Sequence, residues 1–250
     1  MSFGERMIAR PAPGEFRRRI RGLRFLAVHR RAKYLVFSLG NGRSASTPTQ
    51  FLLIHLKMSG RLNVVEHDQP PSKHDHVIFD LDDGQQLRFN DVRKFGRVYL
   101  VIDPEEVTGA HGPEPLEATF TLPEFRKLIK SRSGAIKPLL LNQNFLAGIG
   151  NIYADESLWL ARIHPLRKVN SLKDAEITAL YRSIRQVLRR AIWAQGTDAG
   201  DGIIAGGDYR PRVYDRTDQP CYRCHRPIRR ILVGQRGTHF CPHCQRKGGK

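Results

Sequence analysis

Cys221-Tyr-Arg-Cys224 and Cys241-Pro-His-Cys244 are two Cys-x-x-Cys pairs with sixteen residues between them, and they contain all four cysteines of the chain. Each pair can present two thiolates from one tight turn, so two pairs complete a tetrahedral Zn²⁺ shell. Two disulfides are the alternative, but no signal peptide precedes the cysteines, and intracellular thiols stay reduced. We therefore predict one structural zinc ion bound by Cys221, Cys224, Cys241 and Cys244.

The residues between the two cysteine pairs, 227–240, alternate apolar and polar side chains around Gly234 and Gly237. This alternation predicts a β-hairpin clamped at its base by the metal, with Gln235 and Arg236 near its tip. Residues 210–250 contain eleven Lys or Arg and two Asp. So basic a zinc hairpin indicates polyanion binding, with a solvated basic tail as the alternative.

The whole chain is strongly basic, with a net charge of +18 over 250 residues, 40% of which are hydrophobic. A soluble protein of this charge most often binds nucleic acid, because its Lys and Arg side chains release the counterions of the phosphates. No apolar run approaches the roughly twenty residues that a membrane helix needs. The N-terminus lacks an apolar targeting core. We expect a cytoplasmic protein with no membrane partner.

Strand patterns fill the first half of the chain and helix patterns the second, which predicts an α+β fold. Residues 25–101 are typical of an antiparallel β-sandwich, in which 25–39 form one basic strand bent near Arg30 and Arg31. Thr121-x-x-Glu124 is a capping box that predicts the start of a helix. We expect three domains: a β-sandwich (1–112), a helical domain (113–207) and a zinc finger (208–250).

A set of short segments occurs in an order typical of one known family. The segments are Arg30-Arg-Ala-Lys-Tyr34, His55-Leu-Lys-Met-Ser-Gly60, Lys73-His-Asp-His76, Asp91-Val-Arg-Lys-Phe-Gly96, Gly112-Pro-Glu-Pro-Leu116, Ala135-Ile-Lys-Pro138, Gly148-Ile-Gly-Asn-Ile-Tyr-Ala-Asp-Glu156, Val213-Tyr-Asp-Arg216 and Gly234-Gln-Arg-Gly237. Each motif is weak alone, but the ordered set resembles the formamidopyrimidine-DNA glycosylases, bacterial enzymes that excise oxidised purines. The resemblance implies a β-sandwich, a helix–two-turn–helix domain and a zinc finger. It also implies damaged double-stranded DNA as partner, bound by what we expect to be a monomer.

The N-terminus departs from the family pattern. The resemblance implies a nucleophilic amine on an N-terminal proline followed by Glu, whereas this sequence begins Met1-Ser2-Phe3-Gly4. Judged by spacing to Lys33, about two dozen residues are missing, roughly one strand and one helix. Internal prolines such as Pro11 cannot substitute, because their nitrogen is an amide. Either translation starts further upstream, which we favour, or the chain lacks this chemistry.

The resemblance assigns catalytic roles to two cations. Lys33 matches the family lysine that contacts phosphate and the damaged base and acts as an acid in β-elimination. Arg236 matches the hairpin arginine at the lesion phosphate, to which the δ-elimination acid role is assigned. Because an arginine hardly ever gives up its proton, we interpret Arg236 mainly as a bidentate phosphate clamp. An ordinary surface cation is the alternative at both positions.

The resemblance also implies a set of DNA-binding residues. Met58, Arg93 and Phe95 match side chains that fill the space left by the extruded base. Core packing is the alternative for Met58 and Phe95. The remaining matches are His74, Arg132, Lys137 and Asn151. His74 matches a DNA-contacting histidine, and Lys137 and Asn151 match positions that grip phosphates. We expect Glu156 to pack or cap, and residues 196–212 to form the loop that closes over the damaged base.

Two functions are consistent with this sequence. The first is base-excision repair of oxidised purines, with N-glycosidic cleavage followed by β,δ-elimination at the abasic site. The second is a non-catalytic, zinc-dependent protein that binds damaged DNA, since the N-terminal proline is not in the sequence. A zinc ribbon that binds RNA is a weaker third possibility, because it gives Met58, Arg93 and Phe95 no role.

Overall fold

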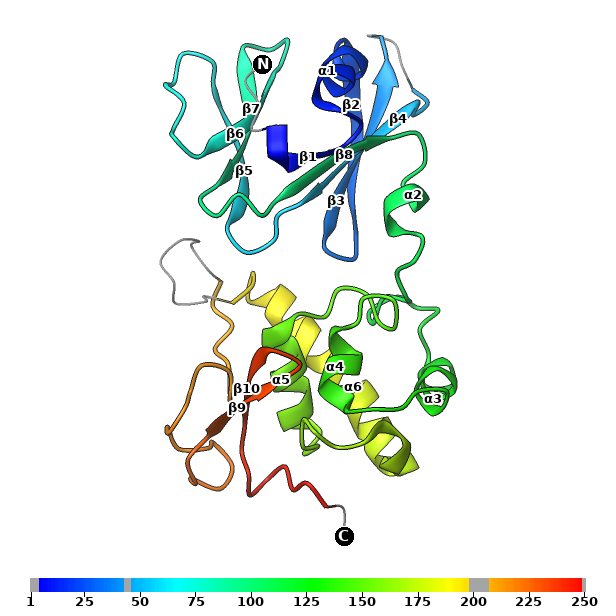
Figure 1. Cartoon of the computed structure of the whole chain (residues 1–250), viewed down its shortest axis with the longest axis vertical. Helices are drawn as coiled ribbons and strands as arrows, with labels where there is room; N and C mark the ends of the chain where they lie inside the picture. The colour runs from blue at the N-terminus through cyan, green and yellow to red at the C-terminus, as the bar shows by residue number, and fades with distance from the viewer. Residues whose placement is uncertain (1–4, 43–45, 198–206, 249–250) are drawn as a thin grey trace. The chain divides into compact units, whose positions relative to one another are not determined.

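A computed structural model of the protein describes residues 5–42, 46–197 and 207–248 (Figure 1). The chain divides into two compact units, residues 1–110 and 111–250. The predicted boundary after residue 112 lies close to this division, and the further boundary after residue 207 stays a prediction. In the described ranges, no helix has both the length and the apolar composition needed to cross a bilayer.

Unit 1, residues 1–110, is a β-sandwich of two sheets. One sheet has the strand order β1-β8-β4-β3-β2 and the other β5-β7-β6. Every pairing is antiparallel except β1 with β8, which is parallel. The elements are η1 Glu5–Met7, β1 Ile8–Arg10, α1 Pro13–Ile20, β2 Leu23–Arg31, β3 Tyr34–Asn41, β4 Gln50–His55, β5 Gly60–Glu66, β6 Asp75–Asp80, β7 Gln85–Asp91, β8 Arg97–Val101 and α2 Glu105–Thr108.

The core of unit 1 lies between the two sheets. The alternating pattern of the strands sends apolar side chains from both sheets inward, where they are removed from water. Phe16 and Ile20, one helical turn apart on α1, join this cluster. The cluster is made of Met7, Ile8, Phe16, Ile20, Leu39, Leu52, Ile54, Val77, Phe79, Leu87, Phe89, Val98 and Leu100.

The segment predicted as one bent strand over 25–39 is instead a hairpin of β2 and β3, and that prediction was wrong. Arg31 pairs with Tyr34, so Ala32 and Lys33 form a two-residue turn. Ala32 has a φ of 53°, an unusual backbone angle for alanine, and no Gly, Asn or Asp marks the turn in the sequence. The hairpin places Lys33 at an exposed tip.

Unit 2, residues 111–250, is helical and ends in a two-stranded hairpin. The elements are α3 Leu122–Lys130, α4 Ile136–Leu141, α5 Asn151–Leu160, η2 Val169–Ser171, α6 Asp174–Trp193, β9 Arg229–Val233 and β10 Arg236–Phe240. The Thr121 half of the predicted capping box is present, because Thr121 Oγ1 accepts a hydrogen bond from the Glu124 amide. Helix α5 packs against α6, α4 and β10 (Figure 1), so it lies at the centre of this unit.

Candidate nucleic-acid interface and zinc site

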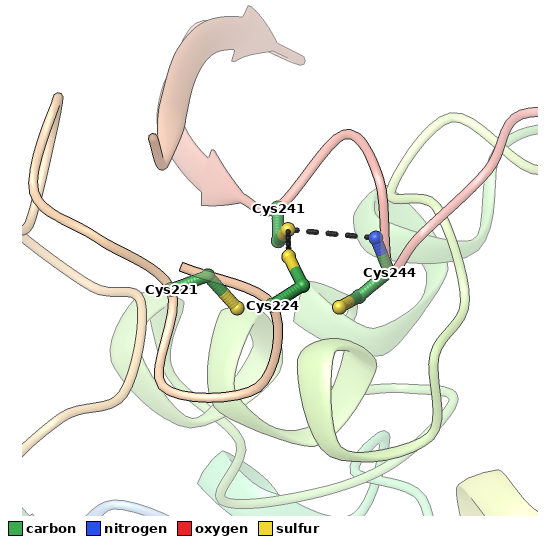
Figure 2. Close-up of side chains that lie close together, drawn as sticks. All are labelled: Cys221, Cys224, Cys241 and Cys244. Atoms are coloured by element: carbon green, nitrogen blue, oxygen red, sulfur yellow. Dashed lines mark hydrogen bonds between the residues drawn. The ribbon is translucent and has the colours of Figure 1, made fainter. Parts of the chain in front are cut away.

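The four cysteine side chains converge, as Figure 2 shows. Their sulfur atoms all lie within 4.8 Å of one another, and none is in a disulfide. Backbone amides of Cys244 and Arg223 point at Cys241 Sγ and Cys221 Sγ, at 3.4 and 3.5 Å. Four thiolates at this spacing fit the tetrahedral sulfur shell of a structural Zn²⁺. Cys221, Cys224, Cys241 and Cys244 therefore form the zinc site, whose role is to hold the hairpin ends together.

The zinc-binding segment is attached to the end of α5. Arg223 donates to the carbonyl oxygens of Trp159 and Leu160 at 2.6 and 3.0 Å, and its guanidinium lies 4.0 Å from the Trp159 ring. Gln245 donates to Ile163 O at 2.9 Å. Orphan carbonyls at the C-terminal end of a helix favour such cationic donors. The zinc segment is thus tied to the C-terminal end of α5 by hydrogen bonds and a cation–π contact.

Arg236 occupies the first position of β10, next to the hairpin turn. Val233 pairs with Arg236, and the two residues between them, Gly234 and Gln235, have φ values of 54° and 60°. Two positive φ angles make a type I′ turn, whose twist matches that of the strands. The predicted hairpin is confirmed, and it exposes the Arg236 side chain while Thr238, His239 and the strand's end are buried.

Lys137 is not placed as its sequence match implied. Its side chain is 0% exposed and its Nζ lies 2.6 Å from Asp155 Oδ1. Nζ also donates to Gly237 O at 3.1 Å and to Thr238 Oγ1 at 2.7 Å. Two hydrogen bonds and the ion pair with Asp155 therefore engage this buried ammonium within unit 2. This placement weighs against the expectation that Lys137 grips DNA directly, which stays a prediction.

The other two predicted phosphate contacts of unit 2 keep donors available. Arg132 is exposed in the segment between α3 and α4. Asn151 is the first residue of α5, and its Nδ2 donates to Gly237 O at 3.0 Å. Its amide group has a second N–H, and the first amides of α5 also favour an anion. Their contact with DNA stays a prediction.

Met58, Arg93 and Phe95 lie on two loops of unit 1, residues 57–60 and 92–96, which we call the wedge loops. Met58 is 57% exposed and Phe95 53% exposed, which excludes core packing for both side chains. Arg93 Nη1 lies 3.5 Å from Met58 Sδ, so the two loops present their side chains side by side. Apolar side chains this exposed next to a guanidinium are suited to enter a DNA stack.

Glycines allow the wedge loops to pack closely on the sandwich. A Cβ on Gly60 would lie 2.7 Å from the Phe89 ring, and one on Gly96 would lie 2.4 Å from it. Both distances are too short for any other residue. The loops are therefore held against one buried aromatic ring, and Met58 and Phe95 are presented next to these two fixed points.

Asp91, which the sequence reasoning missed, joins the two wedge loops. Its buried carboxylate accepts from Ser59 Oγ at 2.5 Å, from Gly96 N at 2.8 Å and from Arg93 N at 3.2 Å. Although burial raises the pKa of Asp91, these hydrogen bonds outweigh burial and the net shift is downward. A carboxylate directly before a Gly-ended polar loop was the available sequence signal.

Two further predicted residues of unit 1 lie on turns. Lys33 is exposed at the β2–β3 tip. His74 is half-buried just before β6, where its carbonyl accepts from the Asp91 amide at 3.0 Å. The neighbouring His76 is buried and lies 3.0 Å from Asp91 O, which fits a structural role. His74 is thus next to the wedge loops, and its DNA contact stays a prediction.

Glu156 binds the backbone amides of a distant segment, residues 212–214, and not those at a helix terminus. Its buried carboxylate accepts from the backbone amides of Arg212, Val213 and Tyr214 at 2.7 to 3.0 Å. Burial raises the pKa of Glu156, and these bonds act in the opposite direction. The sequence left packing and capping open for Glu156, and the structure shows its carboxylate bound to three consecutive backbone amides. Most of the loop predicted to close over a damaged base, residues 198–206, lies outside the described residues.

Taken together, the two units define a class: a zinc-finger, DNA-binding protein with exposed cations on hairpin tips and apolar wedges on neighbouring loops. Residues 2–98 match the family description "Formamidopyrimidine-DNA glycosylase N-terminal domain". Residues 111–201 match its H2TH (helix–two-turn–helix) domain, and 218–246 match the zinc finger found in FPG and IleRS. The chain belongs to the formamidopyrimidine-DNA glycosylase family.

Relatives and solved structures agree with this assignment. A formamidopyrimidine-DNA glycosylase of Herpetosiphon aurantiacus is 47% identical over 87% of this chain and 80% of its own. One from Protochlamydia amoebophila is 41% identical over 98% of this chain and 90% of its own. The Lactococcus lactis FPG (MutM) complex with FAPY-dG-containing DNA has a TM-score of 0.88 at 35% identity, covering 99% of this chain and 91% of that one. A MutM complex with carbocyclic 8-oxo-G-containing DNA has a TM-score of 0.87 at 36% identity, covering 97% and 89%.

Proposed function

We propose that this chain excises oxidised purines from double-stranded DNA and then cleaves the abasic site by β,δ-elimination. The observation that carries the proposal is the exposed set of Met58, Arg93 and Phe95 on loops joined through Asp91. A protein that only coats duplex DNA has no use for such a wedge. The relatives' names and the damaged DNA in the related complexes support the same reaction.

In this proposal the wedge acts first. A glycosylase cannot reach C1′ while the base is stacked, so the damaged nucleotide is extruded and the space it leaves is filled. Met58 and Phe95 enter between base steps, and the Arg93 guanidinium donates to the orphaned partner base. These contacts offset the unstacking cost, which is on the order of a few kcal/mol.

The chemistry that follows needs an amine and phosphate contacts. The amine nitrogen attacks C1′, the base leaves with the glycosidic electron pair, and a Schiff base forms after the sugar ring opens. Loss of the C2′ proton gives its electron pair to the iminium and forms an enamine. The enamine returns the pair and re-forms the iminium, now conjugated with a C2′–C3′ double bond, as the 3′ phosphate leaves with the C3′–O electron pair. Loss of a C4′ proton then expels the 5′ phosphate. Lys33 serves as the acid of the first elimination, and Arg236 neutralises phosphate charge during the second.

The nucleophile is tested separately, because the printed sequence does not start with the Pro-Glu that the family resemblance implies. Protein isolated from its native cell is incubated with an 8-oxoguanine duplex and borohydride. A covalent adduct, mapped by mass spectrometry to an N-terminal proline, is the expected result. Salt-sensitive binding without adduct or strand cleavage would instead support the non-catalytic alternative.

Lys33→Ala tests the role of the hairpin tip, with Lys127→Ala as control, because Lys127 is an equally exposed lysine on α3. Strand cleavage is expected to fall about a hundredfold or more in Lys33→Ala, a typical loss for a general acid, and to remain unchanged in the control. Equal cleavage by both variants would show that Lys33 is not the acid of the first elimination. Action as a monomer in the cytoplasm, drawn to the nucleoid by DNA, belongs to the same proposal.

A further inference from the structure

The backbone around Arg236 is fixed by side chains from two helices. Gly237 O accepts from Lys137 Nζ of α4 at 3.1 Å and from Asn151 Nδ2 of α5 at 3.0 Å. Thr238 Oγ1 accepts from Lys137 Nζ at 2.7 Å and itself donates to Arg236 O at 3.0 Å. The backbone carbonyl of Gly237, directly after Arg236 in the chain, is therefore anchored to helices α4 and α5, and Thr238 links the Arg236 carbonyl to the same lysine.

Asp155 completes this arrangement from the next turn of α5. Its Oδ1 lies 2.6 Å from Lys137 Nζ, and its Oδ2 accepts from the His239 amide at 2.9 Å. The side chains of Lys137 and Asp155 are both fully buried. A buried ion pair is costly to desolvate, so its use here requires a reason beyond stability. The reason we infer is the orientation of β10, to which both partners bond.

We propose that Lys137 and Asp155, here called the hairpin brace, are positioning residues for Arg236 and do not bind DNA themselves. This inference rests on the proposed role of Arg236 as a phosphate clamp. Bidentate contact of a guanidinium with phosphate needs a fixed approach direction. The brace supplies that direction by holding residues 237–239, while the Arg236 side chain itself stays exposed.

Electrostatics within unit 2 agree with this division of roles. Burial lowers the pKa of Lys137, the Asp155 carboxylate opposes that shift, and the nearby Arg236 guanidinium lowers the pKa further. Two adjacent cations would repel each other if both faced solvent without a counter-ion. Asp155 neutralises the charge of the buried Lys137. Of the two cations, Arg236 is therefore the one whose charge faces solvent.

The test removes the brace without leaving a buried charge. Lys137→Met alone would strand the Asp155 carboxylate and risk unfolding, so the variant is Lys137→Met combined with Asp155→Asn, which also keeps the net charge constant. The pair is made in the wild-type and Arg236→Gln backgrounds. Lys127→Met, on the exposed face of α3, is the matched control. Zinc content and a cooperative thermal melt establish folding for each protein.

Two readouts are measured: the ratio of δ- to β-elimination products, and the salt dependence of affinity for a duplex with an uncleavable abasic-site analogue. In the wild-type background the paired change is expected to lower the product ratio and the affinity each about tenfold, the worth of a strong hydrogen bond. In the Arg236→Gln background the paired change is expected to alter neither the product ratio nor the affinity, because the guanidinium that the brace positions is absent. The control matches wild type throughout.

Two outcomes overturn the inference. A folded paired variant with unchanged product ratio and affinity means that the brace does not position Arg236. The second outcome concerns the slope of log affinity against log salt concentration. If the magnitude of this slope falls by about one when the paired change is added to Arg236→Gln, Lys137 contacts a phosphate directly. If wild-type protein cleaves nothing, the proposed function fails, but the affinity measurements still decide the role of the brace.

Discussion

Ser59 Oγ lies 2.5 Å from Asp91 Oδ1, and through this contact one buried carboxylate holds both wedge loops. The same carboxylate group accepts amide protons from the loop that carries Arg93 and Phe95. Met58 is the direct neighbour of Ser59 in the sequence. The side chains that enter DNA in the proposed function are thus ordered before DNA binds, which lowers the entropy lost on binding.

Asp91→Asn is expected to lower the free energy of unfolding by about 2 kcal/mol. An asparagine keeps one acceptor oxygen but turns an NH₂ group towards the amide of Arg93 or of Gly96, where two donors then face each other. Chemical denaturation measures this loss. Asp82→Asn is the control, since Asp82 is exposed on the β6–β7 turn, and it should change the stability by less than about 0.5 kcal/mol. Equal stability of both variants would show that Asp91 does not organise the loops.

The lowered pKa of Asp91 predicts a specific pH dependence. A carboxyl group whose folded pKa lies below its unfolded value stabilises the folded chain above about pH 4. That contribution is lost as the pH falls through the unfolded and then the folded pKa. Between pH 6 and pH 3, wild type should therefore lose more thermal stability than Asp91→Asn. If the melting temperatures of the two proteins fall by the same amount across this pH range, the lowered pKa of Asp91 is contradicted.

Met58→Ala separates a DNA wedge from a core residue. Because Met58 is more than half exposed, its truncation should change the free energy of unfolding by less than about 0.5 kcal/mol. Affinity for a duplex with an abasic-site analogue should nevertheless fall about tenfold, since the stacked apolar surface is lost. Val64→Ala is the matched control: Val64 is similarly exposed on β5, away from the wedge loops. If Met58→Ala lowers the free energy of unfolding but not the affinity for DNA, Met58 is a core residue and not a wedge.

Local sequence signals account for what could be predicted of this fold. The zinc shell and its hairpin follow from cysteine pairs with two residues between the ligands and from strand alternation, so spacing alone identifies them. The β2–β3 turn was missed because Ala32 adopts a positive φ without the residues that normally signal it. Nothing within a few residues of Ala32 distinguishes one bent strand from two paired strands.

The interior polar contacts could not be predicted, because their partners are distant in sequence. Lys137 meets Asp155 eighteen positions on and Thr238 a hundred and one positions on. A lysine in a motif is read as exposed, since lysine is almost never fully buried unless paired. Two adjacent acids, Asp155 and Glu156, on the otherwise uncharged helix α5 were the one signal that buried carboxylates would be needed.

Zinc removal is expected to release the hairpin and leave the helices of unit 2 folded. The helical core contains none of the cysteines, whereas the buried part of the cluster beneath the zinc site is Trp159, Val213, Cys221, Ile228 and Cys241, with Leu160, Cys224 and Cys244 packed against it. So small a cluster cannot replace a metal that contributes on the order of 10 kcal/mol to the folding of a zinc finger. Chelation, or Cys224→Ser, should therefore free β9 and β10 and abolish the ordered presentation of Arg236.

Tryptophan fluorescence reports this release, because the chain has two tryptophans in opposite environments. Trp159 is 7% exposed and contacts Arg223 of the zinc segment, whereas Trp193 is 89% exposed. In a Trp193→Phe background, chelation should shift the Trp159 emission to longer wavelength while far-UV circular dichroism keeps its helical signal. Duplex affinity should fall in parallel and return when Zn²⁺ is added back. Loss of the helical signal at the same chelator concentration would mean instead that the metal supports the whole unit, because the helices would then depend on contacts that only the closed zinc segment provides.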